Sequence, residues 1–209
     1  MGSDLYRTGK EVSIVKNLLV TGYRAHELGI YNSKHEGIPY IRQAIISRLI
    51  PLLDEGLEWV ITPGQYGVDL WACEAAIELR RQYPELKCAI ITAFSNPEQQ
   101  WKEEKKAYYH ELISKVDFCT STSKEPYSGP WQFTARDELL LRKTDGILLV
   151  YDEEMGEASP KYIKQRALKK QAVENYPVIT IGAEEIQAIA DEDRQNMEGR
   201  NISQDDILW

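Results

Sequence analysis

The sequence predicts one α/β domain, in which helices cover both faces of a doubly wound, mostly parallel sheet. From residue 12 to about residue 190, short apolar runs of strand length alternate with longer amphipathic runs of helix length, an order typical of β-α-β units. The apolar runs are also continuous, as in residues 147–150, and strands buried on both faces have this composition. No segment rich in proline, glycine and serine divides the chain, so we expect a single domain.

The strands and helices follow one another in a regular order. We expect the strands at residues 14–21, 59–61, 88–92, 116–120, 146–151 and 178–181. The segments between them carry apolar residues at helical spacing. We expect the helices at residues 41–52, 68–82, 96–114, 130–143 and 160–174, with a short helix from residue 183. Asn96 and Pro97 are typical of a helix start, because asparagine caps free amides and proline suits the first helical position.

The two ends of the chain differ from its middle. Residues 1–12 are polar and form an N-terminal tail, and residues 13–190 form the predicted domain. Residues 191–209 carry six acidic and two basic side chains, a net charge of −4 that is half of the chain's −8. We expect this acidic tail to be mobile or loosely docked, as chain termini often are.

The balance of charges and apolar residues excludes several functions. Among 209 residues, 33 are acidic and 25 are basic, and an acidic surface repels nucleic acids and anionic membranes. No stretch approaches the roughly 18 consecutive apolar residues of a membrane span, and the N-terminus lacks a signal-peptide pattern. We therefore expect a cytoplasmic protein that binds neither membrane nor nucleic acid, although a local basic pocket can still hold one small anion.

The cysteines suggest no metal centre. Cys73, Cys88 and Cys119 are odd in number, lie in apolar runs and have no spacing typical of metal ligands. We expect all three to be reduced core residues, and no bound metal.

The loop after the first strand is the first candidate binding segment, because ligands of open parallel sheets bind beyond the carboxyl ends of the strands. Gly22 directly follows this strand and lets a ligand approach the backbone, with Tyr23 beside it. Arg24 can hold a phosphate or a carboxylate with two hydrogen bonds. The alternative is a tight turn with a solvated arginine.

The loop after the second strand contains two glycines at a predicted helix start. Gly64, Gln65 and Gly67 can present backbone amides to an anion. Asp69 falls in the first helical turn, where its own charge uses the helix dipole, so it suits ribose hydroxyls better than a diphosphate. The alternative is that Asp69 only stabilises the helix start.

Aromatic residues mark the third and fourth loops. Trp101 and Trp131 can stack on a base, while nearby hydroxyl groups and Lys124 can contact phosphate. The alternative is that the aromatic residues cover the sheet, which we favour for Phe133. Among catalytic signatures, the chain lacks GxSxG, the Walker loop, HExxH, CxxC and GxGxxG.

Several loop motifs occur together in an order typical of a known family. These motifs are Gly22-Tyr23-Arg24, Glu27-Leu28-Gly29, residues 54–59, residues 64–71, Trp101-Lys102-Glu103, Tyr151-Asp152 and residues 159–162. They resemble the YpsA-like family of bacterial proteins in the SLOG superfamily, over roughly residues 15–190. The resemblance implies a Rossmann-like domain, related to DprA and to the LOG proteins, that binds a nucleotide-derived ligand such as a relative of NAD or ADP-ribose. The ligand-binding residues that it implies are Gly22, Tyr23, Arg24, Gly64, Gln65, Gly67, Asp69 and Trp71.

The second loop departs from the related LOG phosphoribohydrolases, which resemble PGGxGTxxE at this place. This chain has Gln65 for the second glycine, Val68 for the threonine and Trp71 for the catalytic glutamate. The departure argues against hydrolysis of nucleotide monophosphates by this loop. Family members usually carry glutamate where Asp69 stands, so the shorter acid is expected to shift the ligand geometry.

These observations favour a binding protein over an enzyme. The leading hypothesis is a cytosolic sensor or regulator that binds a nucleotide-derived ligand and signals through a protein partner or a second copy of the chain. The alternative is an enzyme that cleaves the N-glycosidic bond of a nucleotide, with Asp69 as its candidate catalytic carboxylate. A DprA-like protein that binds single-stranded DNA is the least favoured, because the chain is acidic and has no basic stripe.

Overall fold

The computed structural model of the chain describes residues 14–156 and 158–205. Its six strands form one sheet in the order β4-β3-β2-β1-β5-β6, and every pairing is parallel. The strands are β1 (Asn17–Gly22), β2 (Trp59–Thr62), β3 (Lys87–Thr92), β4 (Phe118–Ser121), β5 (Gly146–Val150) and β6 (Val178–Ile181). The predicted fold class, a doubly wound parallel sheet in a Rossmann-like domain, is confirmed.

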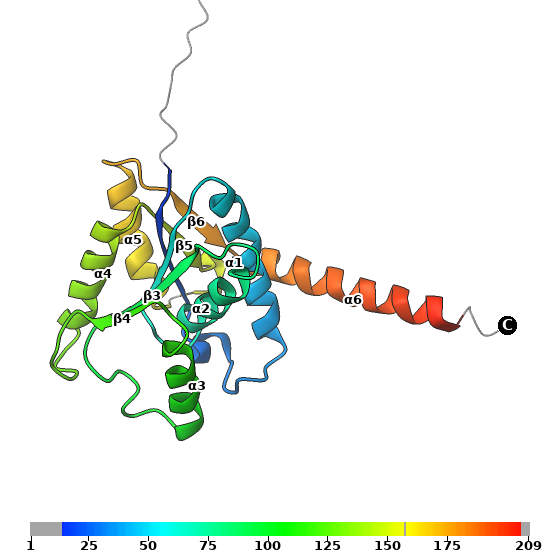
Figure 1. The fold of residues 1–209 in the computed structure, drawn as a ribbon, viewed down its shortest axis with the longest axis horizontal. Coiled ribbons are helices and arrows are strands. Elements are labelled where there is room, and N and C mark those ends of the chain that lie inside the picture. Colours follow the sequence, from blue (N-terminus) through cyan, green and yellow to red (C-terminus); the bar gives the residue numbers. More distant parts are fainter. Residues whose placement is uncertain (1–13, 157, 206–209) are drawn as a thin grey trace, which may run out of the picture.

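Helices cover both faces of this sheet. They are α1 (Gly37–Asp54), α2 (Val68–Leu79), α3 (Glu103–Ile113), α4 (Trp131–Lys143), α5 (Pro160–Gln171) and α6 (Ala183–Asp205), with short 3-10 helices η1 (Ala25–Leu28) and η2 (Glu153–Met155). In Figure 1, α4 and α5 lie on one side of the sheet and α1 and α2 on the other, with α3 next to α2.

The strand order reverses between β1 and β5, which positions the candidate site. Gly22 pairs with Val150 at the carboxyl ends of these two strands, and ligands of such sheets bind near this point of reversal. The centre of the sheet is buried, since Leu18, Leu19 and residues 147–150 of β5 are at most 2% exposed. Burial on both faces explains the continuous apolar runs of the sequence.

Two local predictions were wrong. The helix expected from residue 96 begins only at Glu103, because Asn96 takes a left-handed backbone conformation with φ of 51°. Asparagine tolerates this conformation better than most residues, and turns follow until α3 begins. Cys119 is exposed, because β4 is an edge strand whose residues are largely solvent-accessible. Cys73 and Cys88 are buried, as expected.

The last helix is longer than the sequence suggested. It runs without a break from Ala183 to Asp205, so residue 190, the expected end of the domain, lies within it. The first part of α6 contacts α1, and the rest projects away from the domain (Figure 1). The expected tail at residues 1–12 and the last four residues, 206–209, lie outside the described residues.

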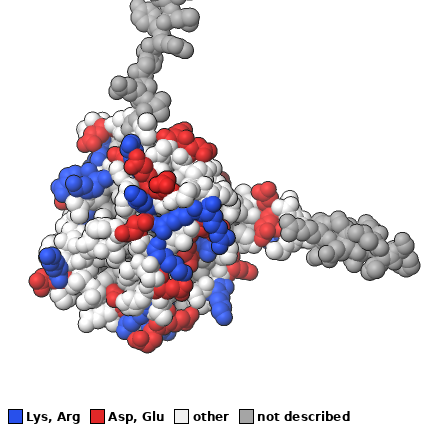
Figure 2. All heavy atoms as spheres, in the orientation of Figure 1, with Lys and Arg blue, Asp and Glu red and all other residues white. Residues whose placement is uncertain are grey.

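Charges of both signs are mixed on the face of the domain that Figure 2 shows. Figure 2 shows Lys and Arg interspersed with Asp and Glu on one face, so that neither sign dominates it. Within residues 14–156 and 158–205, no helix is long and apolar enough to cross a membrane.

Candidate ligand site

The loops that follow β1 and β2 are joined by a short antiparallel bridge. The Ala25 amide donates a hydrogen bond to the Tyr66 carbonyl at 3.0 Å, and the Val68 amide donates to the Tyr23 carbonyl at 3.1 Å. Gly67 lies between them with φ of 139°, and a Cβ there would lie 2.5 Å from the Ala25 nitrogen. Only glycine fits this position, because any side chain at residue 67 would keep the two loops apart.

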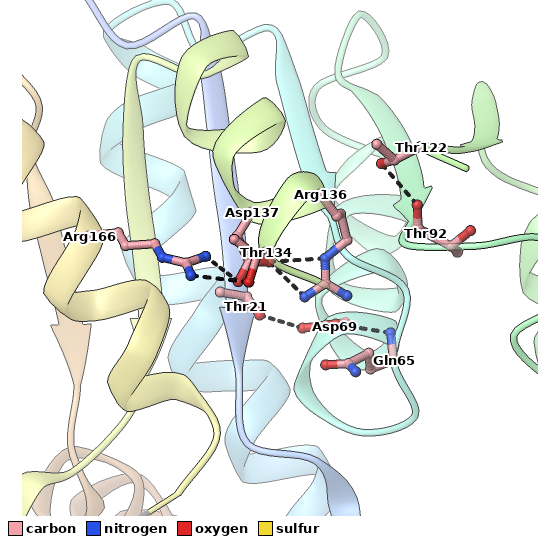
Figure 3. A network of polar contacts seen from close by, with 9 residues as sticks. All are labelled: Thr21, Gln65, Asp69, Thr92, Thr122, Thr134, Arg136, Asp137 and Arg166. Atoms are coloured by element: carbon pink, nitrogen blue, oxygen red, sulfur yellow. Dashed lines mark hydrogen bonds and ion pairs between the residues drawn. The ribbon is translucent and has the colours of Figure 1, made fainter. Parts of the chain in front are cut away.

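The buried side chain of Asp69 holds the loop after β2 in its shape. Its side chain accepts hydrogen bonds from the Thr21 hydroxyl at 2.7 Å and from the Gln65 amide at 2.9 Å (Figure 3). The residue is only 2% exposed. Burial raises its pKa to about 6, against the lowering effect of these two hydrogen bonds. Both carboxylate oxygens therefore accept hydrogen bonds from the chain itself, and neither is available to a ligand.

Glu27 forms similar hydrogen bonds at the start of α5. Its carboxylate accepts hydrogen bonds from the Ser159 amide at 2.9 Å, the Ser159 hydroxyl at 2.8 Å and the Arg24 amide at 2.6 Å. Burial raises the pKa of Glu27, but these hydrogen bonds outweigh it and leave the pKa below the ordinary value of 4.5. The helix starts of α2 and α5 thus each carry a carboxylate of the chain itself, so an anionic ligand must be held mainly by side chains.

A cavity of about 440 Å³ opens at the carboxyl ends of β2 and β3. Its lining includes four cationic side chains and no aspartate or glutamate, in a chain of net charge −8. The cations are Arg24, Lys102, Lys105 and Arg136. Aromatic rings line it as well: Tyr66, Phe94, Trp101 and Phe133. This combination of cations and rings is the strongest chemical signal in the described part of the molecule.

Three of the four cations of this cavity lie close to an aromatic ring. The Lys105 ammonium is 4.2 Å from the centre of the Tyr66 ring. The guanidinium carbons of Arg24 and Arg136 are 5.9 Å and 5.4 Å from the centre of the Phe133 ring. The buried Nε of Arg24 has no hydrogen-bond partner in the described structure. A buried donor without a partner costs free energy, so this atom is available to an acceptor on a ligand.

A second cavity of about 350 Å³ adjoins the first. The two share four lining residues: Arg24, Gln65, Phe133 and Arg136. In the second cavity, Nε and Nη2 of Arg136 donate to Oδ1 of Asp137 at 3.0 and 2.7 Å, and Nη1 of Arg166 lies 3.5 Å from Oδ2 of the same carboxylate (Figure 3). One carboxylate therefore lies between two guanidinium groups.

The residues predicted from sequence divide into lining and supporting groups. The first cavity is lined by Arg24, Gly64, Gln65 and Trp101, and the second by Gly22, Arg24 and Gln65. Gly67 and Asp69 support the loops, and the Tyr23 hydroxyl donates to the Asp152 carbonyl at 2.9 Å. Trp71 is 2% exposed and borders a separate cavity of about 170 Å³. Trp131 is 59% exposed and lines neither of the two larger cavities at the site.

Sequence reasoning missed several lining residues. Phe133 was expected to cover the sheet, yet it lies in the wall between the two cavities. Arg136 follows it by three residues on α4, a spacing that places both on one helix face. This pairing after a polar loop was the available signal. Lys102 and Lys105 have the same spacing at the start of α3.

No metal centre is formed by the side chains that the structure describes, since none of their His, Cys, Asp and Glu residues form a group of three or more suited to a metal ion.

The strand order and the cavities at the carboxyl edge of the sheet define a Rossmann-like α/β protein. The family model described as the YspA SLOG family matches residues 18–186.

Curated bacterial proteins resemble the chain over most of its length. A UPF0398 protein of Lysinibacillus sphaericus is 48% identical over 177 residues, which is 85% of this chain and 98% of the relative. A UPF0398 protein of Brevibacillus brevis is 46% identical over 184 residues, 88% of this chain and 97% of the relative. UPF0398 protein YpsA of Bacillus subtilis is 42% identical over 179 residues, 86% of this chain and 99% of the relative. The chain belongs to the YpsA family of SLOG proteins.

Proposed function

We propose that this protein binds a nucleotide-derived ligand in the cavity between Arg24 and Lys105. The observation that carries the proposal is the lining itself, with four cations, four aromatic rings and no carboxylate among its described residues. Phosphate is bound by guanidinium and ammonium groups, and the flat face of a base packs on aromatic rings. A volume of about 440 Å³ is in the range of small-molecule sites.

The class of ligand follows from the two kinds of side chain in this lining. Trp101 and Phe94 offer surfaces for a base, and Arg24 with its unpartnered Nε offers a phosphate site. Relatives of NAD or ADP-ribose combine both groups. A cytosolic sensor or regulator, acting through a protein partner or a second copy of the chain, is the role that we propose for such a binding protein.

An N-glycosidic bond-cleaving enzyme is less well supported. Such an enzyme needs a carboxylate that faces the sugar. Asp69 is buried with both oxygens in hydrogen bonds to the chain, and no described carboxylate lines the first cavity.

Isothermal titration calorimetry and thermal unfolding with NAD, ADP-ribose, AMP and adenosine test the proposal. A bound member of this panel at 100 times its Kd raises the free energy of unfolding by about 2.7 kcal/mol. Arg24→Gln and Lys105→Gln each weaken binding about tenfold or more, as expected for one lost charge-assisted hydrogen bond. Lys124→Gln is the matched control, because Lys124 is exposed and lines neither cavity. No binding by any member of the panel, or equal losses in all three variants, would contradict the proposal.

A further inference from the structure

Resting on the proposed function, we infer that the ligand carries two adjacent phosphates and crosses the boundary between the cavities, which Arg24, Phe133 and Arg136 line on both sides. The chemical class is a nucleoside diphosphate. Its base and first phosphate occupy the first cavity, and its second phosphate occupies the second.

The shared wall is the first argument. Arg24 and Arg136 line both cavities, and their guanidinium groups both contact the Phe133 ring. Two guanidinium groups beside one ring can each hold a different oxygen of a diphosphate that passes between the cavities. Nη1 of Arg136 forms none of the hydrogen bonds found in the described structure, since Nε and Nη2 donate to Asp137.

The charge balance is the second argument. Together the two cavities are lined by five lysine and arginine side chains and one carboxylate, that of Asp137. A phosphate monoester carries a charge of about −1.5 to −2 at neutral pH, so a single phosphate leaves much of this positive charge unpaired. A second phosphate beside Arg166 balances it more closely. The contacts of Arg166 to Asp137 and Thr134 are long, 3.5 and 3.3 Å, and a phosphate can replace them.

The hydrogen-bond pattern of the second cavity explains why guanidinium groups are the donors. The Thr21 hydroxyl already donates to Asp69, and the Ser159 hydroxyl and amide already donate to Glu27. The start of α5 is therefore closed to a phosphate by the chain's own carboxylate. Arg24, Arg136 and Arg166 are the cationic donors that the described lining leaves for the second phosphate.

Calorimetric titration of adenosine, AMP and ADP, repeated with the guanosine series, tests this inference. We expect ADP to bind at least about tenfold more tightly than AMP, the gain of one charge-assisted hydrogen bond. Arg166→Gln should remove this gain and leave the affinity for AMP within about twofold, because Arg166 lines only the second of these two cavities. Arg166→Lys keeps the charge, and its affinity for ADP should lie between that of the unaltered protein and that of Arg166→Gln. Lys169→Gln makes the same charge change at an exposed position of α5 and should alter neither affinity.

The outcomes separate this inference from the proposed function. Equal affinities for AMP and ADP would overturn the second phosphate site while leaving nucleotide binding intact. A loss of AMP affinity in folded Arg166→Gln, as judged by circular dichroism, would overturn the division between the cavities. No binding by any nucleotide of either series would remove both proposals.

Discussion

Asp69 accepts hydrogen bonds from the end of β1 and from the loop after β2, and so connects the two. The sequence suggested a carboxylate facing ribose, whereas the side chain holds Thr21 and the Gln65 amide beneath the loop. Its contribution to the proposed binding is indirect, through the shape of the loop after β2, of which Gln65 lines both cavities.

The pH dependence of stability tests this environment. Folding raises the pKa of Asp69 from 3.8 to about 6, so the folded chain keeps its proton in a range where the unfolded chain has lost it. The free energy of unfolding should therefore decrease as the pH is raised from 4 to 6. The decrease should be up to about 3 kcal/mol for two pKa units. Asp69→Asn should lack this decrease. Urea unfolding of both proteins from pH 3.5 to pH 8 measures the difference, and a difference that stays constant with pH would contradict the assignment.

Lining residues were predictable at the carboxyl ends of strands. Gly22 ends β1, and Arg24, Gly64 and Gln65 follow β1 or β2 within three residues. All four line one or both cavities. Trp131 was named only because it is aromatic. The residue type does not tell in which direction a side chain at a helix start points, and Trp131 lines neither cavity.

The bridge between the first two loops joins elements that are more than 40 residues apart. Arg24 and Gly67 form it, and Gly67 lies against backbone atoms of Tyr23 and Ala25. Because Arg24 belongs to this bridge, the backbone of the residue whose Nε has no hydrogen-bond partner in the described structure is held in place.

Gly67→Ala should disrupt this element more than an alanine at another left-handed glycine. The new Cβ would lie 2.5 Å from one backbone atom and 2.6 Å from another, so strain and crowding together should cost more than about 3 kcal/mol. Gly29→Ala is the control, because Gly29 also has positive φ but open space around it, and it should cost about 1 kcal/mol. Chemical denaturation compares the two variants. Equal losses would show that crowding at the bridge is unimportant.

The start of α5 offers a second test at this scale. Glu27→Gln should lower the free energy of unfolding by about 1 kcal/mol at pH 7, the usual effect of losing a helix cap. Ser159→Ala removes one of the same contacts, so the double variant should lose less than the two single losses combined. Additive losses would argue that Glu27 and Ser159 stabilise the chain independently.

Elements were predicted well where burial decided them. The central strands are apolar on both faces, and the sequence marked all six strands at nearly their observed positions. The start of α3 was misplaced because an asparagine–proline pair begins a turn as readily as a helix. Local residue types do not distinguish these two outcomes when the backbone of Asn96 adopts positive φ.

The composition of the cavities depends on the whole molecule. The first cavity takes residues from the loops after β1, β2 and β3 and from α3 and α4. Which of these meet is decided by the strand order, and the sequence indicates that the sheet is parallel but not the order of its strands. The spacing of Phe133 and Arg136 was visible in the sequence, but the cavity that they line could not be assigned until the strand order was known.

The extent of the folded unit can be tested by truncation of α6. Ile186 and Ile189 contact the core, and Arg48 forms two hydrogen bonds with Glu185. Deleting residues 183–209 should therefore cost at least about 2 kcal/mol. Deleting residues 195–209 should change the free energy of unfolding by less than about 1 kcal/mol, because Met197 is largely exposed on the projecting part. Thermal unfolding distinguishes the two, and equal losses would show that the projecting part stabilises the domain.

The carboxylates of Glu27 and Asp69 have a consequence for the kinetics of the site. They belong to the chain and form hydrogen bonds with the loops in the absence of a ligand, so we expect these loops to keep their shape when a ligand binds. A site formed in advance requires little ordering when it is filled, and the encounter rate then limits capture. With a cationic cavity on an acidic protein, that rate should depend steeply on ionic strength.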